Sequence, residues 1–316
     1  EQNNFCIEPQ FLINIHSDEA TQELINKIES GSILLEEYFS VARGVGLYHK
    51  RVGHTKEFIE KDPFFSNQIS DNSFVPYLRG KNLSRYNIDW NNDGFVSYGK
   101  WLAEPREPKY FEGDRLLLRQ IPGDKLYCTF LDEKFVIDQS VFIARNESLR
   151  IDTKYVLSIL ASSLMAFYFR NKFSEFDELF PKLKLSHFKK LPIKDSIDQQ
   201  PFIAKADTML SKNKELHTLK QSLLKVLAAK HEGLTPSKKL ADWPSLNFKD
   251  FIKELEKAKV KLSLPDQAEW LSYFEAEKAK AAALQAIISQ TDKEIDAMVY
   301  ALYGLTEEEI QIVESN

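Results

Sequence analysis

The longest regular pattern in the chain is an apolar series between Gln267 and Leu302 that alternates steps of four and three residues. Its members are Trp270, Phe274, Ala281, Leu284, Ile288, Ile295, Met298 and Leu302, with Glu277 and Thr291 in the two polar positions. This spacing lines one side of a helix with apolar side chains, which a second helix must cover. The run from Phe202 to Lys230 can supply that cover, so the pattern predicts a long antiparallel helical pair, close to a coiled coil.

A polar stretch, residues 233–264, separates the two helical runs. Its prolines interrupt regular structure, and Phe248 to Val260 is expected to form a short helix within it. Beyond the second run, Gly304 is expected to end the helix, and Thr306 with Glu309 predicts a capping box for a last one.

The pattern of apolar residues is different from Ile33 to Phe142, where short apolar runs are broken by Gly, Pro, Asn and Asp. Strands are expected at 94–98, 115–121, 126–130 and 135–144. Turn sequences at 122–124 and 131–134 predict hairpins between the last three of these strands. A helix is expected from Asp152 or Thr153 to about Phe169, because its apolar positions follow a 3.6-residue period.

These strand-like and helical patterns predict an α+β (mixed α/β) fold, in which a domain with a mixed sheet precedes the helical pair. The expected division is an entry segment at 1–31, a mixed domain at 32–195 and a helical spacer domain at 196–316, with the insert at 233–264. Ser17 or Asp18 is expected to cap a short helix in the entry segment.

Composition favours a folded protein: 43% of the residues are hydrophobic and 12% aromatic, which excludes general disorder. Cys6 and Cys128, the two cysteines, have no metal-binding spacing, which favours a reducing, cytoplasmic location without structural zinc. No secretory signal or membrane-length apolar run is visible. Because the chain begins at Glu1 rather than Met, we expect a piece of a longer protein.

The net charge is −5, but the charges are unevenly distributed. Residues 41–195 hold 25 Lys and Arg against 20 Asp and Glu, so this segment is mildly basic. A local positive field attracts phosphates more effectively than the total charge suggests. The segment therefore remains compatible with a nucleic-acid partner.

The corner Arg79-Gly80-Lys81 follows the apolar run Phe74–Leu78 and precedes another cation, Arg85. Gly80 is expected to take a positive φ and to remove any Cβ between the backbone and a ligand. Two cations beside a free backbone N–H suit a phosphate. A solvated surface turn has the same sequence, so the corner alone is a weak signal.

The motifs around this corner come in a definite order. They are Val41–Gly46 with Lys50-Arg51, then Pro105–Tyr110, Arg115–Ile121, Phe135–Phe142, Tyr155–Leu164 and Phe188–Ile193. As an ordered set, over about residues 30–195, they resemble the C-terminal specificity domain of Taq-type adenine DNA methyltransferases and of fused type IIG restriction–modification enzymes. The ending Asp296–Val313, which contains the run Val299–Thr306, also resembles the ending of type IIG enzymes.

The resemblance implies a DNA target-recognition module that is not itself an enzyme. Its partners would be double-stranded DNA and the methyltransferase or nuclease modules of the same parent chain. S-adenosylmethionine and Mg²⁺ would serve that missing catalytic part, and no cofactor is expected in this chain.

Searches for catalytic chemistry agree with this expectation. An adenine methyltransferase needs an Asn-Pro-Pro-Tyr-like tetrapeptide against the flipped base, and the chain contains no Pro-Pro. Asp114 with Asp132-Glu133-Lys134 mimics a nuclease carboxylate cluster, but the second group falls where a hairpin turn is expected. We therefore assign no catalytic or metal-binding residue.

Cations near the corner are candidates for DNA phosphates, and amides with further cations are candidates for base edges. The phosphate candidates are Arg43, Lys50, Arg51, Arg79, Lys81 and Arg85. The base candidates are Asn82, Lys100, Arg106, Arg119 and Gln139. The aromatics among these cations are Tyr86, Trp90, Tyr98, Trp101 and Tyr110, and at least half are expected to lie in the core.

Two other interpretations remain open. The helical pair could make the chain a protein-interaction scaffold, with the mixed domain as a folded platform. The chain could also be a fragment of a type I restriction specificity subunit, which would normally carry two such domains.

Overall fold

A computed structural model describes residues 6–7, 12–13, 19–148, 150–173, 183–231 and 233–315. The chain forms two compact units. The mixed unit comprises Glu1–Asp207 and Glu294–Asn316, and the helical unit comprises Thr208–Lys293. Neither 31/32 nor 195/196 separates these units. The predicted caps Ser17 and Asp18 lie outside the described residues.

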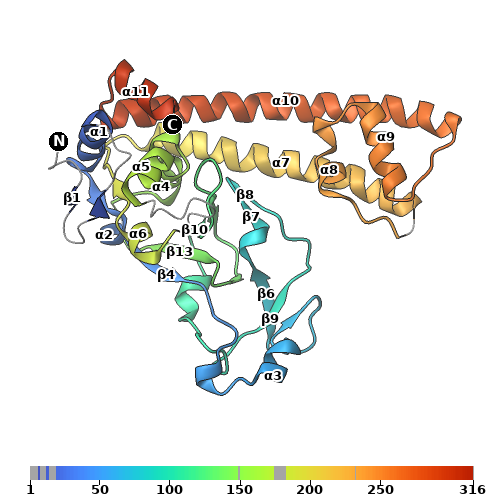
Figure 1. The fold of residues 1–316 in the computed structure, drawn as a ribbon, viewed down its shortest axis with the longest axis horizontal. Helices are drawn as coiled ribbons and strands as arrows, with labels where there is room; N and C mark the ends of the chain where they lie inside the picture. The colour runs from blue at the N-terminus through green and yellow to red at the C-terminus, as the bar shows by residue number, and fades with distance from the viewer. Residues whose placement is uncertain are drawn as a thin grey trace. The chain divides into compact units, whose positions relative to one another are not determined.

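The first sheet of the mixed unit is antiparallel, with the strand order β11-β10-β13-β4. Figure 1 labels β10, β13 and β4 of this sheet. Its strands are β4 (Phe39–Arg43), β10 (Arg115–Arg119), β11 (Cys128–Leu131) and β13 (Val141–Asn146). Leu116, Leu117 and Leu118 are all fully buried, so the sheet is covered on both faces. This explains why β10 is a continuous apolar run rather than an alternating one.

The second sheet is mixed, with the order β12-β6-β9-β5. Its strands are β5 (Phe65–Ser66), β6 (Phe74–Leu78), β9 (Phe95–Ser97) and β12 (Val136–Ile137). The pair β12–β6 is parallel, whereas β9 runs antiparallel to both β6 and β5. Pro76 lies inside β6, where its missing N–H would weaken a longer ladder.

A single apolar core joins the two sheets. Leu117, Val141 and Ile143 from the first sheet pack in one cluster with Tyr77 and Val136 from the second. The other face of the first sheet meets helices, and Phe142 of β13 stacks on Phe188 of α6 (Leu185–Lys189) with ring centroids 5.9 Å apart. The sheets therefore have a fixed relation within this unit, which positions the loops between them.

The remaining elements of the mixed unit are short or lie around the sheets. The helices are α1 (Glu19–Glu29), α2 (Leu35–Tyr38), α3 (Lys56–Glu60), α4 (Thr153–Leu160), α5 (Ser163–Phe173) and α11 (Glu307–Glu314). Two-stranded ladders pair β1 (Cys6–Ile7) with β2 (Leu12–Ile13), β3 (Ile33–Leu34) with β14 (Pro192–Ile193), and β7 (Leu83–Ser84) with β8 (Asn87–Ile88). The predicted capping box of Thr306 and Glu309 is confirmed.

Two predicted elements are wrong in the same way, because each is two elements. The expected strand 135–144 divides into β12 and β13, which belong to different sheets, so 131–134 is not a hairpin turn. The expected helix 152–169 divides into α4 and α5, although Asp152 caps its start as predicted. Ser162 Oγ donates to the Ile159 carbonyl at 2.7 Å at the break. A local side-chain bond of this kind competes with helix continuation.

The two long helices are confirmed as α7 (Gln200–Lys230) and α10 (Leu264–Tyr303), each with residues in both units. Between them lie α8 (Lys238–Ala241), a 3₁₀ turn at Trp243–Ser245 and α9 (Phe248–Lys257). Within the helical unit, Phe274 of the predicted apolar series is fully buried against Phe251 and Trp243. Leu284 is only half-buried, so its share of this packing is smaller than the spacing predicts.

Candidate functional site

Three chain connections meet at the junction of the two sheets in the mixed unit. Residues 44–46 leave β4, the 3₁₀ turn Gly80–Asn82 follows β6, and residues 138–140 lead from β12 to β13. We call Asp138-Gln139-Ser140 the 138–140 connector. Each of the other two connections contains a glycine, and a cation lies next to that glycine in the sequence: Arg43 before Gly44, and Lys81 after Gly80.

Close approach, rather than unusual backbone conformation, requires the glycines. A Cβ on Gly44 would lie 2.2 Å from the carbonyl oxygen of Asp138, and one on Gly80 would lie 2.8 Å from Ser140 Oγ. Both distances are shorter than a Cβ tolerates. The expectation of a positive φ at Gly80 is wrong, because Gly80 is not among the residues with φ above zero.

Hydrogen bonds hold the 138–140 connector on several sides. The backbone N–H of Gly80 donates to Ser140 Oγ at 2.9 Å, and the Asp138 N–H donates to the Leu78 carbonyl at 2.8 Å. The Asp138 carboxylate accepts from the Tyr77 hydroxyl and from the Ser140 N–H, both at 2.8 Å. Burial, with the Asp138 charge, raises the pKa of Tyr77 well above its usual value, so the phenol stays protonated as a donor.

Three predicted residues are in direct contact at this connector. Arg43 Nε donates to the carbonyl oxygen of Gln139 at 2.6 Å, and Arg106 Nε donates to the carbonyl oxygen of Arg43 at 2.9 Å. An amino group of Arg106 also forms an ion pair of 2.8 Å with Glu104. The structure therefore brings Arg43, Arg106 and Gln139 together, although 96 residues separate the first from the last.

Arg79, Lys81 and Arg119 lie beside the same connector. The Arg79 guanidinium sits 4.1 Å above the Phe65 ring, and that of Arg119 lies 5.2 Å from the Tyr127 ring centroid. Arg119 Cγ would be 3.7 Å from a Cβ on Gly80. Lys81 is exposed. The rings orient two of these cations, and stacked guanidinium groups lose less freedom on binding a ligand.

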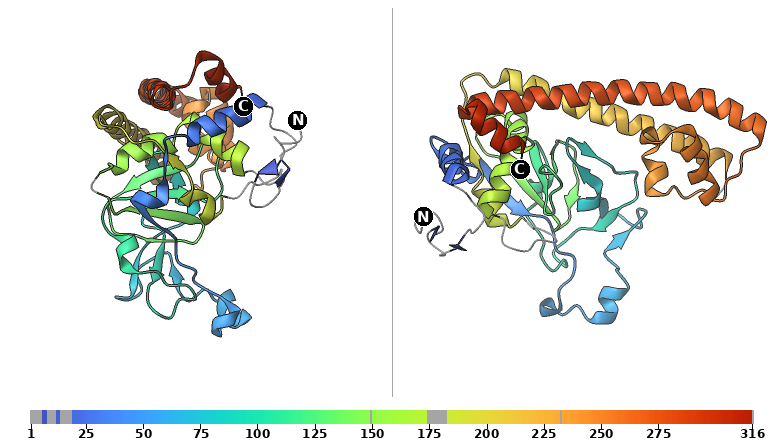
Figure 2. Two further views of the ribbon diagram at one scale, coloured as in Figure 1. Left: turned by 90° about the vertical axis from the view of Figure 1, so that its left-hand side faces the viewer. Right: turned by 45° about the horizontal axis from the view of Figure 1, so that its top comes forward.

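Lys50, Arg51 and Lys100 lie elsewhere in the mixed unit. Lys50 and Arg51 are exposed in a 3₁₀ turn, Lys50–Val52, close in sequence to α3, and Figure 2 shows this segment projecting from the rest of the unit. Tyr48, His54, Phe58 and Phe64 form an aromatic cluster that stiffens the projection. Lys100 is exposed in the turn after β9, beside Trp101.

Two of the predicted residues, Asn82 and Arg85, form hydrogen bonds within the fold, and their assignment to DNA stays a prediction. Asn82 is buried, its carbonyl group accepts from the Arg79 N–H, and its amino group donates to the Asp89 carbonyl at 2.7 Å. Arg85 Nε donates to the Ala161 carbonyl at 2.9 Å. Internal hydrogen bonds therefore hold both side chains.

The expectation for the interleaved aromatics is confirmed. Tyr86 is buried, and Trp90, Tyr98 and Tyr110 pack against the core that joins the sheets. Trp101 is the exception among the five, with 48% of its surface exposed. Most of these aromatic side chains therefore pack in or against the core.

Asp138, Ser140 and Glu104 were missed by sequence reasoning. Asp138-Gln139-Ser140 is a three-residue polar break between two apolar runs, and that break is the signal that could have identified a connector rather than a strand interior. Glu104 has no comparable signal, since its contact with Arg106 depends on the loop conformation. Among the described residues, no three His, Cys, Asp or Glu side chains gather in a way that could hold a metal ion.

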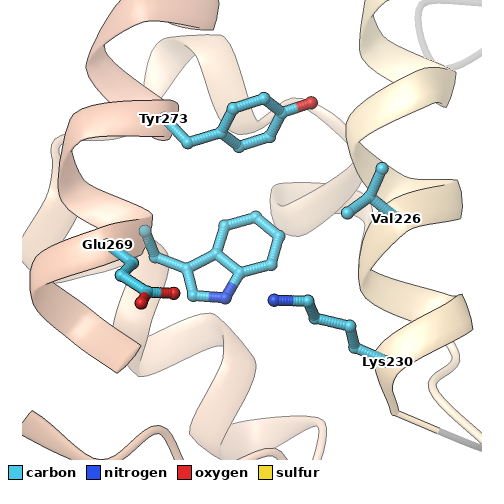
Figure 3. A pocket seen from close by; sticks show the side chains of 5 residues that line it. Val226, Lys230, Glu269 and Tyr273 are labelled. Atoms are coloured by element: carbon cyan, nitrogen blue, oxygen red, sulfur yellow. The ribbon is translucent and has the colours of Figure 1, made fainter. Parts of the chain in front are cut away.

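The helical unit has a separate, open pocket of about 270 Å³. Val226 and Lys230 of α7 face Glu269, Trp270 and Tyr273 of α10 across it (Figure 3). The Lys230 ammonium lies 5.6 Å from the Trp270 ring centroid. Two aromatic rings, one cation and one carboxylate therefore line the pocket, together with Val226.

A family model matches part of the mixed unit. The TaqI-like C-terminal specificity domain matches residues 75–193. This range carries a TaqI-like specificity domain. It includes the Gly80 turn, Arg106, Arg119 and the 138–140 connector, but not Arg43. A second model, described as a domain of unknown function (DUF8810), matches residues 195–299, which hold most of the long helical pair.

Three of the solved structures that are similar to the chain come from restriction–modification systems. The type I S subunit from M. genitalium is 14% identical over 72% of this chain and 47% of that chain, with a TM-score of 0.35. The HsdS subunit from Thermoanaerobacter tengcongensis is 11% identical over 76% and 50%, with a TM-score of 0.35. The type IIL enzyme MmeI in complex with DNA is 9% identical over 84% and 36%, with a TM-score of 0.36.

The chain thus spans about half, or less, of the length of these three proteins. No curated protein matches it. No helix in the described ranges has the length and apolarity needed to cross a bilayer.

Proposed function

We propose that the chain is the DNA sequence-specificity module of a restriction–modification system and that it catalyses no reaction itself. The observation that carries this proposal is the 138–140 connector, where Arg43, Arg106 and Gln139 meet beside Arg79 and Lys81. Cations on a rigid edge hold phosphates in register, and an amide among them can contact base edges. The match to a specificity domain over residues 75–193 supports the same function.

The parent protein, in this proposal, is a type IIG enzyme or an adenine-N6 methyltransferase located in the cytoplasm. Its methyltransferase or nuclease modules would use S-adenosylmethionine and Mg²⁺, while this chain selects the site. The helical unit would act as the spacer toward those modules, with its two antiparallel helices as a short coiled coil. A fragment of a type I specificity subunit would perform the same task, and that alternative stays open.

Fluorescence anisotropy with the full 316-residue chain tests the function. We expect binding to mixed-sequence duplexes that weakens steeply with salt, and enrichment of one sequence from a randomised pool. Incubation with S-adenosylmethionine or Mg²⁺ should give neither methylated nor cleaved DNA. Failure to bind any duplex at low salt would contradict the proposal.

A protein-interaction scaffold is the second candidate, and one observation favours it. The helical unit exposes Val226, Leu271, Tyr273 and Ile287, each between 38% and 43%. Apolar side chains exposed along a helical pair often mark a surface that another protein covers. Analytical ultracentrifugation of the full chain separates the candidates. Self-association without DNA binding would favour the scaffold.

A further inference from the structure

Gln139 differs from every other candidate at the sheet junction in how it is held. Its side chain is exposed, whereas its backbone is fixed by neighbours on both sides. Arg43 Nε binds its carbonyl at 2.6 Å, the Asp138 carboxylate accepts the next N–H, and Ser140 accepts from Gly80. A side chain on such a support is positioned before any ligand arrives, which favours selective contacts over adaptable ones.

Gly46 lies beside this amide. A Cβ on Gly46 would be 3.6 Å from Gln139 Oε1, an ordinary van der Waals distance. The other candidates have different arrangements. Asn82 uses both ends of its amide internally, Arg106 forms an ion pair with Glu104, and Arg119 lies over Tyr127.

We propose that Gln139 is the adenine-reading residue of this module, an inference that rests on the proposed function. A glutamine amide donates to N7 and accepts from the N6 amino group of adenine in the major groove, and this two-bond match distinguishes adenine from the other bases. Arg43 and Asp138 are positioning residues, because they hold the backbone of the connector rather than the base.

The replacement Gln139→Glu keeps the shape of the side chain and changes its chemistry. A glutamate accepts hydrogen bonds at both oxygens, which suits the N4 amino group of cytosine and not the N7 acceptor of adenine. Selection from a randomised duplex pool with the full chain should therefore show a change from adenine to cytosine at one position. Affinity for the original site should fall about 5- to 150-fold.

Two further variants separate base reading from charge and from folding. Gln68→Glu makes the same charge change at another exposed glutamine of the mixed unit, and it should leave the selected sequence unchanged. Gln139→Ala should lose the preference for adenine without gaining one for cytosine. Its salt dependence should equal that of the unaltered chain, because no phosphate contact is removed.

The possible outcomes separate this inference from the proposed function. An unaltered chain that selects a sequence, with a Gln139→Glu variant that selects the same one, overturns the assignment of Gln139 and leaves the proposed function intact. The assignment also fails, with the function intact, if Gln139→Ala weakens binding to all sequences equally. An unaltered chain that binds DNA without preference, or not at all, overturns the proposed function and this inference with it. Thermal unfolding of each variant confirms that it is folded.

Discussion

The guanidinium Nε of Arg85 donates a hydrogen bond of 2.9 Å to the backbone carbonyl of Ala161, the residue that caps the end of α4. Helix ends leave carbonyls without intrahelical partners, and a cation there also interacts favourably with the helix dipole. Burial lowers the pKa of the Arg85 guanidinium. This arginine joins the β7–β8 region to α4.

Removal of this side chain should affect stability rather than DNA binding. In the Arg85→Ala variant the Ala161 carbonyl loses its charged donor, at a cost of about 1–3 kcal/mol in the free energy of unfolding. Urea denaturation measures that loss. The salt dependence of DNA binding by the folded variant should match that of the unaltered chain, and a reduced slope would place Arg85 on the DNA after all.

Lys81 should behave in the opposite way. It is exposed on the turn after β6, so Lys81→Ala should leave the free energy of unfolding within about 0.5 kcal/mol. The slope of log K against log salt should decrease by about 0.9, the value for one phosphate contact on B-DNA. Titrations at several salt concentrations on matched and mismatched duplexes test this, and loss confined to one sequence would indicate a base contact.

Gly80 and Ser140 should be energetically coupled. In Gly80→Ala the new methyl group lies 2.8 Å from Ser140 Oγ, and such overpacking costs about 1–3 kcal/mol. Ser140→Ala removes the clashing hydroxyl, so the two losses should not add. A double-mutant cycle by chemical denaturation should give a coupling above about 0.5 kcal/mol. Additive losses would show that the turn moves away from the connector.

Gly44 should tolerate no side chain. A Cβ there meets the backbone carbonyl oxygens of Asp138 and Ile137 at 2.2 and 2.3 Å, and backbone cannot move aside as a side chain can. We expect Gly44→Ala to lower the free energy of unfolding by more than about 4 kcal/mol. Gly113→Ala is the control, since it meets no atom within 4 Å and has a φ of +71°. It should cost only about 1–2 kcal/mol.

Two residues of the same apolar series should differ in the helical unit. Phe274 is fully buried, so Phe274→Ala should cost about 3–5 kcal/mol. Leu284 is half-buried, and Leu284→Ala should cost less than about 2 kcal/mol because fewer contacts disappear. Circular dichroism during thermal unfolding measures both. Equal losses would mean that the exposed side of Leu284 is covered in solution, as a scaffold requires.

Local sequence patterns predicted the elements that local physics determines. The apolar series between Gln267 and Leu302 predicted α10, Asp152 predicted the start of α4, and Thr306 with Glu309 predicted the start of α11. Each depends on side chains within a few residues of one another. The division of 135–144 was missed because Val136 pairs with Tyr77, a partner that the segment itself does not reveal.

For the candidate site too, the sequence indicated the chemistry of single residues but not the contacts between distant ones. Arg43, Arg106 and Gln139 have suitable chemistry in the sequence, but only the sheet topology brings them into contact. Asn82 and Arg85 have equally suitable chemistry, and the tertiary fold places both in internal hydrogen bonds. Gly80 was correctly singled out for the wrong reason, since steric proximity of Ser140 requires it rather than a left-handed turn.

The helical unit starts within α7 at Thr208 and ends within α10 at Lys293, and just outside it Lys205 forms an ion pair with Glu294. The chain therefore leaves the mixed unit and returns to it at neighbouring points, so residues 208–293 form one continuous cassette between those points. Deleting one heptad from each helix would shorten the cassette by about 10 Å and keep its apolar series in phase. Deleting seven residues from only one helix would misalign the pair. The lengths of α7 and α10 can therefore change only together.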